Sequence, residues 1–160
     1  MASTFVYVTY IRATPEKIWD ALRKPEFTRQ YFFGVTQESD WKVGSSWTMF
    51  APGDKLTDSG EVLEFDAPRK LVLKWRNEFV PEMKAEGYSR CTFDLASQDG
   101  GITQLKVTHE MDVDNSQTIA GVSRGWPKIL AGLKTLLETG QPMEGSDQAK
   151  VNREKAAAKA

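Results

Sequence analysis

The sequence predicts an α+β fold in which a curved antiparallel sheet packs against one long C-terminal helix. Three observations lead to this fold class. From residue 35 to 113, apolar and polar residues alternate with a period of two, which is typical of strands with one buried face. Two short helical patterns precede this segment. An apolar stripe with steps of three and four residues follows it, as in an amphipathic helix. Sheet and helices then form the layers of one core.

Composition excludes several classes of protein. The chain has 160 residues, with 22 acidic and 21 basic side chains and a sequence pI near 5.9. This length is sufficient for a core without disulfides, and the balanced charge argues against nucleic-acid binding. Cys91 and His109 are single residues of their types, which excludes an internal disulfide and a zinc site of histidines and cysteines. We therefore expect no metal and no other cofactor.

The ends of the chain differ from its centre. Residues 141–160 hold no aromatic residue and too few apolar ones to form a core, so we expect a flexible tail there. The folded domain is expected at residues 4–140. No apolar run approaches the about 20 residues of a membrane span, and residues 1–4 start no signal-peptide pattern. A cytoplasmic protein is the resulting expectation.

The first elements follow from residue type. Residues 4–11 are β-branched and aromatic, which predicts a strand. Thr14 and Pro15 then form the start of a short helix, as cap and first helical residue. Its apolar face carries Ile18, Trp19 and Leu22. A second short helix is predicted from Pro25.

The alternating segment divides into strands at its turn residues. Six strands are predicted near residues 35–41, 45–51, 59–66, 70–77, 87–97 and 102–113. Residues 66–69 (Asp-Ala-Pro-Arg) and 99–101 (Asp-Gly-Gly) provide hairpin turns, and residues 52–59 form a longer polar loop.

Alternation also assigns one side of each strand to the core. Positions on the opposite side are mostly polar, so one face of the sheet is buried and the other is exposed. The residues predicted to face inward are Trp47, Met49, Glu61, Leu63, Phe65, Leu71, Leu73, Trp75, Cys91, Phe93, Leu95, Leu105, Val107, His109 and Met111.

The last element is a long helix that covers this face. Asn115 and Ser116 suit its N-terminal cap and Gly140 its end. Its apolar stripe consists of Ile119, Val122, Trp126, Leu130, Leu133 and Leu137. Because Pro127 lies inside this stretch, we expect either a kink near Arg124 or a helix that starts there.

Three stretches, in this order, resemble a known family. They are TPEKIWDAL at residues 14–22, GEVLEFDAPRKL at residues 60–71 running on to Trp75, and GWPKIL at residues 125–130 with Leu133. Over residues 5–140 the chain resembles the activator-of-heat-shock-protein-90-ATPase-homologue family within the START-like, Bet-v-1-like (SRPBCC) superfamily.

This resemblance implies a helix-grip fold, with a cavity between the sheet and the C-terminal helix. It also implies binding of hydrophobic small molecules such as lipids, hormones or polyketides, and some members catalyse reactions on them. The eukaryotic activator has a separate N-terminal chaperone-binding domain with no counterpart in these 160 residues. A chaperone interaction is therefore a less favoured expectation.

The inward aromatic residues are the candidate site. We predict that the ligand pocket is lined by Trp47, Met49, Phe65, Trp75, Phe93, His109, Trp126 and Leu130, the alternative being that these side chains fill the core. His109 could bond a ligand or act as a general base, or be satisfied by a neighbouring group. Glu61 could pair with Arg90 or Arg124, or lie at the sheet rim.

Three functions stay open at this point. The first is binding of a hydrophobic small molecule. The second is an enzyme of the same fold, a cyclase, hydratase or hydrolase, although no catalytic residue is evident. The third is an interaction domain that regulates a chaperone, which would need an exposed apolar patch on the outer sheet face. The sequence does not predict the oligomeric state.

Overall fold

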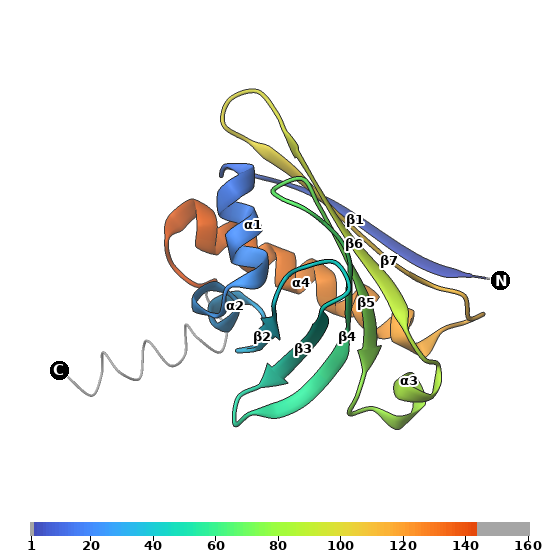
Figure 1. Ribbon diagram of the computed structural model, residues 1–160. Coiled ribbons are helices and arrows are strands. Elements are labelled where there is room, and N and C mark those ends of the chain that lie inside the picture. Colours follow the sequence, from blue (N-terminus) through green and yellow to red (C-terminus); the bar gives the residue numbers. More distant parts are fainter. Residues whose placement is uncertain (1, 144–160) are drawn as a thin grey trace.

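The computed structural model describes residues 2–143, and within them a seven-stranded antiparallel sheet wraps around a long C-terminal helix (Figure 1). The predicted α+β helix-grip fold is confirmed. Residues 144–160, most of the predicted tail, lie outside the described residues. In chain order the elements are β1 (Ser3–Ile11), α1 (Pro15–Arg23), α2 (Pro25–Tyr31), β2 (Thr36–Ser39), β3 (Ser46–Ala51), β4 (Lys55–Asp66), β5 (Lys70–Asn77), α3 (Pro81–Ala85), β6 (Ser89–Ser97), β7 (Thr103–Met111) and α4 (Gln117–Thr139).

The strand order is β1-β7-β6-β5-β4-β3-β2, and every neighbouring pair is antiparallel. Strands β2 to β7 therefore form a meander, and β1 pairs with the last strand of it. Since β1 and β2 lie at opposite edges, helices α1 and α2 carry the chain from one edge to the other across the concave side (Figure 1). Helix α4 crosses the same concave side and closes the core.

The inward faces predicted for β3, β5, β6 and β7 are confirmed. Their residues are at most 6% exposed: Trp47, Met49, Leu71, Leu73, Trp75, Cys91, Phe93, Leu95, Leu105, Val107, His109 and Met111. The apolar stripe of α4 meets this face through Trp126, Leu130 and Leu133, which are similarly buried. Burial of this apolar area is the main stabilising contribution to the fold.

Strand β4 differs from its prediction in two ways. It begins at Lys55, so most of the predicted polar loop at residues 52–59 belongs to a strand. A bulge also interrupts its pairing with β5, because Val62 pairs with Leu73 while Glu64 pairs with Val72. The extra residue is Leu63, and one extra residue exchanges the two faces of a strand.

The prediction that Glu61 and Leu63 face the core is therefore wrong. Val62 is fully buried, and Asp58 lies on the same side of β4, ahead of the bulge. Phe65, after the bulge, returns to the inward face as predicted and packs edge-on against Trp19 at 5.2 Å between ring centroids.

Helix α4 begins at Gln117 and runs unbroken through Pro127, so the predicted alternative of a start near Arg124 is wrong. The Ser116 hydroxyl caps the helix by accepting the Ile119 N–H at 3.1 Å. The short helix α3, which the sequence pattern did not predict, brings Glu86 to the same end. The Glu86 carboxylate accepts hydrogen bonds from the N–H groups of Gln117 and Thr118 and from the Ser116 hydroxyl. Its negative charge also compensates the positive end of the α4 dipole.

Gly60 lies where β4 and β5 leave no room for a side chain. It pairs with Trp47 on one side and Trp75 on the other, and the two indoles meet at 4.5 Å between ring centroids. A Cβ atom at Gly60 would lie 1.7 Å from the Lys74 carbonyl oxygen, which is backbone and cannot turn away. A glycine is therefore required at this position.

We expect Gly60→Ala to lower the free energy of unfolding by about 3 kcal/mol or more, because the added methyl group overlaps the backbone of β5. Gly125→Ala is the matched control. Its Cβ would meet no atom closer than 3.8 Å, so the gain in helix propensity should stabilise α4 by about 0.5–1 kcal/mol. Urea denaturation followed by circular dichroism measures both effects. Equal stability of the two variants would contradict this account of Gly60.

Candidate functional site

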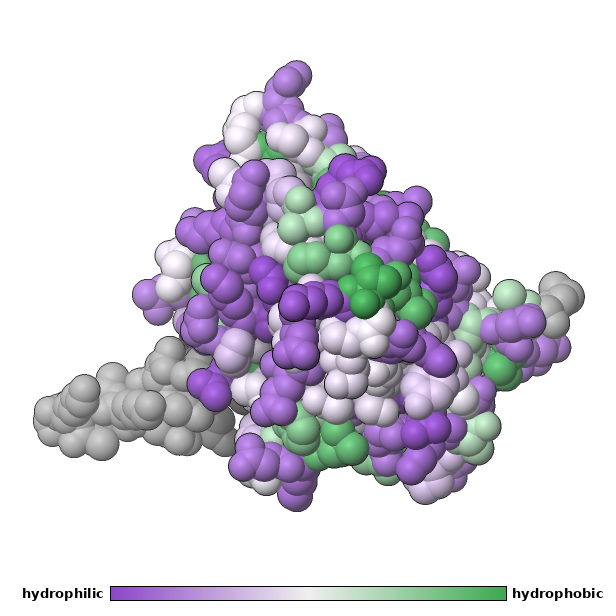
Figure 2. All heavy atoms as spheres, in the orientation of Figure 1, coloured by the Kyte–Doolittle hydropathy of each residue, from purple (hydrophilic) through white to green (hydrophobic). Residues whose placement is uncertain are grey.

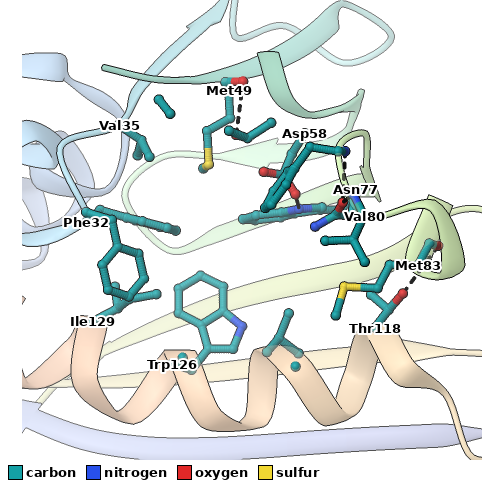
Figure 3. A pocket seen from close by; sticks show the side chains of 18 residues that line it. Phe32, Val35, Met49, Asp58, Asn77, Val80, Met83, Thr118, Trp126 and Ile129 are labelled. Atoms are coloured by element: carbon teal, nitrogen blue, oxygen red, sulfur yellow. Dashed lines mark hydrogen bonds between the residues drawn. The ribbon is translucent and has the colours of Figure 1, made fainter. Parts of the chain in front are cut away.

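A cavity of about 400 Å³ lies between the concave face of the sheet and α4 (Figure 3). Five parts of the chain line it. They are the end of α2 with the following segment (Phe32, Phe33, Val35), strands β3 and β4 (Met49, Ala51, Thr57, Asp58), the end of β5 (Trp75, Asn77), the α3 segment (Phe79, Val80, Met83), and α4 (Thr118, Gly121, Val122, Gly125, Trp126, Ile129). A volume of this size matches pockets for small organic ligands.

The walls of the cavity are mainly apolar and aromatic. Phe32 packs edge-on against Trp126 at 5.6 Å between ring centroids, and Trp75 packs against Trp126 at 5.9 Å. Phe33 and Phe79, both part of the lining, are 50% and 62% exposed, so the apolar surface continues out to solvent. Elsewhere, the face of the molecule in Figure 2 is covered mostly by hydrophilic residues, with separate apolar clusters.

The predicted site residues divide into two groups. Met49, Trp75 and Trp126 line the cavity. The others lie outside its lining: Trp47 packs against Trp75, Phe93 and His109 pack against Trp126, Leu130 is buried in the core, and Phe65 packs against Trp19. Trp47, Phe93 and His109 therefore support the walls from behind, while Phe65 and Leu130 belong to the core.

His109 joins α4 to the sheet through buried hydrogen bonds. The Trp126 indole N–H, which can only donate, lies 3.1 Å from Nδ1 of His109. Nδ1 must therefore be the unprotonated nitrogen, and Nε2 carries the proton. Nε2 lies 2.7 Å from the Ser89 hydroxyl oxygen, whose own proton goes to the Trp75 carbonyl oxygen at 2.9 Å. These three hydrogen bonds form a relay in which each donor points away from α4 and into the sheet.

This direction matters for chemistry. A serine nucleophile needs a histidine nitrogen that accepts its proton, and here Nε2 donates to Ser89 instead. Burial also lowers the pKa of His109 to about 3, so the ring stays neutral at physiological pH. The relay therefore fixes the position of Trp126 and leaves His109 without a free nitrogen for a ligand.

Asp58 is the charged residue of the cavity lining, and it was not among the predicted site residues. It is 9% exposed, and its Oδ2 accepts the Trp75 indole N–H at 2.7 Å (Figure 3). Burial raises the pKa of this carboxyl, the neighbouring Trp75 indole and Thr57 hydroxyl oppose the rise, and the nearby Glu78 carboxylate adds to it. If the alternation of inward and outward residues in β4 is assigned separately before and after Leu63, Asp58 falls on the inward face.

The other polar side chains of the lining are bonded to the backbone. The Thr57 hydroxyl donates to the Met49 carbonyl oxygen at 3.2 Å, and the Thr118 hydroxyl donates to that of Met83 at 3.5 Å. Asn77 accepts the N–H groups of Phe79 and Val80 through Oδ1, at 3.0 and 2.8 Å. These two bonds hold the backbone turn at residues 77–80, which forms the rim of the cavity just before α3.

Within residues 2–143 the structure shows neither a cluster of metal-ligating side chains nor a membrane-spanning helix. In that range no group of three or more His, Cys, Asp or Glu side chains is placed to hold a metal ion. Of the helices described, none has both the length and the apolar character to cross a membrane.

A sheet that grips a C-terminal helix, with an apolar pocket between the two, defines the helix-grip class of the START-like, Bet-v-1-like (SRPBCC) superfamily. The chain belongs, more particularly, to the family described as Activator of Hsp90 ATPase homolog 1-like protein, whose model matches residues 12–138. No curated protein matches the chain.

Solved structures share this fold. Protein MLL2253 from Mesorhizobium loti is 25% identical with a TM-score of 0.71, over 85% of this chain and 97% of that one. CalU16 from Micromonospora echinospora is 20% identical with a TM-score of 0.67, over 98% and 85%. PFC0360w, described as an HSP90 activator from Plasmodium falciparum, is 23% identical with a TM-score of 0.69, over 84% and 96%. The likeness to the last two shows the fold alone.

Because His109 is buried and neutral, we expect the protein to lose stability in mild acid. Its pKa is 6.5 when unfolded and about 3 when folded, so below pH 6.5 the unfolded chain takes up a proton that the folded chain refuses. From about pH 7.5 to about pH 5 this should remove about 2 kcal/mol from the free energy of unfolding.

His109→Gln should be less stable at neutral pH but should lose about 2 kcal/mol less over the same interval, because its amide does not titrate. Urea denaturation of both proteins at the two pH values gives the difference. Other groups, including Asp58, are common to both proteins and cancel. Parallel pH dependence of the two proteins would show that His109 is not buried as described.

Proposed function

We propose that the protein binds a hydrophobic small molecule, of lipid or polyketide-like kind, in the cavity between the sheet and α4. The single observation that carries this proposal is the apolar cavity of about 400 Å³ lined by Phe32, Trp75 and Trp126. A cavity of that kind, with few polar groups, suits a ligand that is driven from water by its apolar surface. The exposed rings of Phe33 and Phe79 offer such a ligand a first contact.

An enzyme of the same fold is the alternative, and Asp58 is the observation that favours it. A buried carboxyl with a raised pKa at the wall of a pocket can transfer protons in a cyclase or hydratase. A hydrolase of the serine type has less support, because the Ser89–His109 pair has its proton on the histidine side. Mass spectrometry of a bound lipophile before and after incubation distinguishes turnover from binding.

A protein partner is a further candidate, favoured by a row of apolar side chains on the outer face of β1. Val6, Val8 and Tyr10 are 43–50% exposed there. PFC0360w, a protein of the same fold, is described as an HSP90 activator. Stimulation of an Hsp90 ATPase by this protein, lost in Val8→Lys, would support a chaperone interaction; unchanged ATPase rates would reject it. The cytoplasmic location stays a prediction of the sequence.

Filling the cavity should abolish binding without unfolding the protein. Gly125 lines the cavity from α4, and an added Cβ there would contact only Ile129 Cδ1, at 3.8 Å, so Gly125→Leu should occupy ligand volume. Nile red, a neutral dye with polarity-sensitive emission, should bind wild type in a 1:1 complex. We expect Gly125→Leu to weaken that binding by about tenfold or more, the equivalent of about 1.4 kcal/mol.

Ala120→Leu is the matched control, because it adds the same side chain at an exposed position of the same helix. It should bind the dye as wild type does. If wild type gave no saturable signal with Nile red or with a panel of neutral lipophiles, the binding function would be wrong. Equal affinities of Gly125→Leu and Ala120→Leu would place the ligand elsewhere.

A further inference from the structure

We propose that the ligand of the cavity carries a hydroxyl group, and that Asp58 and Asn77 recognise it together as hydrogen-bond acceptor and donor. This inference deepens the proposed binding function and rests on it. It names the chemical class of ligand: a neutral, mainly apolar alcohol or phenol, in preference to a carboxylate, an ammonium or an ether.

Asp58 and Asn77 lie side by side at one end of the cavity. Asp58 on β4 and Asn77 on β5 are directly paired in the antiparallel register, and both line the cavity. Paired residues project to the same face of a sheet, with Cβ atoms about 5 Å apart. Figure 3 shows the two side chains next to each other at one end of the cavity, with Trp126 and Ile129 on the opposite wall.

Asp58 supplies the hydrogen-bond acceptor. Oδ2 of Asp58 accepts the Trp75 indole N–H, and the Thr57 hydroxyl is a second donor close to this carboxyl. The neighbouring Thr57 hydroxyl is directed to the Met49 carbonyl oxygen. A carboxylate has about four acceptor sites, and it is costly to leave them without donors in an apolar cavity. Oδ1 is thus an acceptor available to a ligand.

Asn77 supplies the hydrogen-bond donor. Oδ1 of Asn77 accepts two backbone N–H groups, which identifies the other terminal atom as the amide nitrogen. No hydrogen bond among the described residues uses that nitrogen. The end of the cavity therefore presents one free acceptor on Asp58 and one free donor group on Asn77.

A hydroxyl group is the smallest ligand group that both donates and accepts, and so it satisfies both side chains at once. An ammonium would leave the Asn77 amide without an acceptor and would have to give up its hydration in an apolar site. A carboxylate would accept from Asn77 but would be repelled by Asp58. An ether can accept from Asn77 and has nothing to donate to Asp58.

Three naphthalene derivatives of similar size test this discrimination by isothermal titration calorimetry at pH 7.5. They are 2-naphthol, its methyl ether 2-methoxynaphthalene, and 2-naphthoate. The ether keeps the acceptor oxygen and lacks the donor. Because a hydrogen bond to a charged acceptor is replaced by an unpaired carboxylate, wild type should bind 2-naphthol about tenfold more tightly than the ether. The naphthoate should bind most weakly of the three.

Asp58→Asn should replace the hydrogen-bond acceptor that faces the cavity with a donor, and it should keep the fold. Its amide oxygen can still accept the Trp75 indole N–H, which leaves the NH₂ group to face the cavity. The preference for 2-naphthol over the ether should fall to about one or reverse, and 2-naphthoate should gain affinity. Asp99→Asn, the same change at an exposed turn residue, should bind all three probes as wild type does.

Equal binding of 2-naphthol and its ether by wild type would overturn the inference, and so would a preference that persists in Asp58→Asn. Either result would leave the binding function itself intact. Failure of all three probes to bind wild type, together with a failure of Nile red, would overturn the function and the inference at once. The wild-type comparison needs no variant, so it holds even if Asp58→Asn folds poorly.

Discussion

The position of α4 on the sheet is fixed by the buried hydrogen-bond relay from Trp126 through His109 and Ser89 to the Trp75 carbonyl oxygen. Apolar packing alone would let α4 slide or rotate on the sheet, because contacts between aliphatic side chains have little directional preference. A relay of fully buried polar groups allows one arrangement, since any other leaves a donor or acceptor unsatisfied. It thereby fixes the position of Trp126, one wall of the cavity.

The opposite wall is held by a second buried bond, between the Trp75 indole and Asp58. Each wall is thus held by a hydrogen bond from its indole N–H: that of Trp126 goes to His109, outside the cavity lining, and that of Trp75 goes to Asp58, within it. Supporting residues such as Trp47 and Phe93 fill the space behind them. This arrangement accounts for an interior space next to a densely packed core, where side chains would otherwise collapse on one another.

Much of the fold could be predicted from the sequence, because alternation and helical periodicity are local properties. The buried faces of β3, β5, β6 and β7 and the stripe of α4 followed from them. Strand β4 is the exception, because the bulge at Leu63 exchanges its two faces for the residues before it. Uninterrupted alternation therefore assigns Glu61 to the inward face and does not identify Asp58. Helix α3 is too short to show a helical period.

Whether large side chains fill a space or enclose it depends on the distances between elements, and the periodicity of a sequence does not contain these distances. That is why Trp75 and Trp126 line the cavity while Trp47 and Phe93, with the same inward pattern, do not.

The close grouping of three indoles has an optical consequence. Trp47, Trp75 and Trp126 form a contiguous series with ring centroids 4.5 and 5.9 Å apart, while Trp19 and Trp41 lie at a separate place beside Arg23. Excitation absorbed by any of the three can pass among them, and two of them border the cavity. Their emission energy and anisotropy therefore depend on what occupies that space. The intrinsic fluorescence of the protein can thus report on the occupancy of the cavity without an attached label.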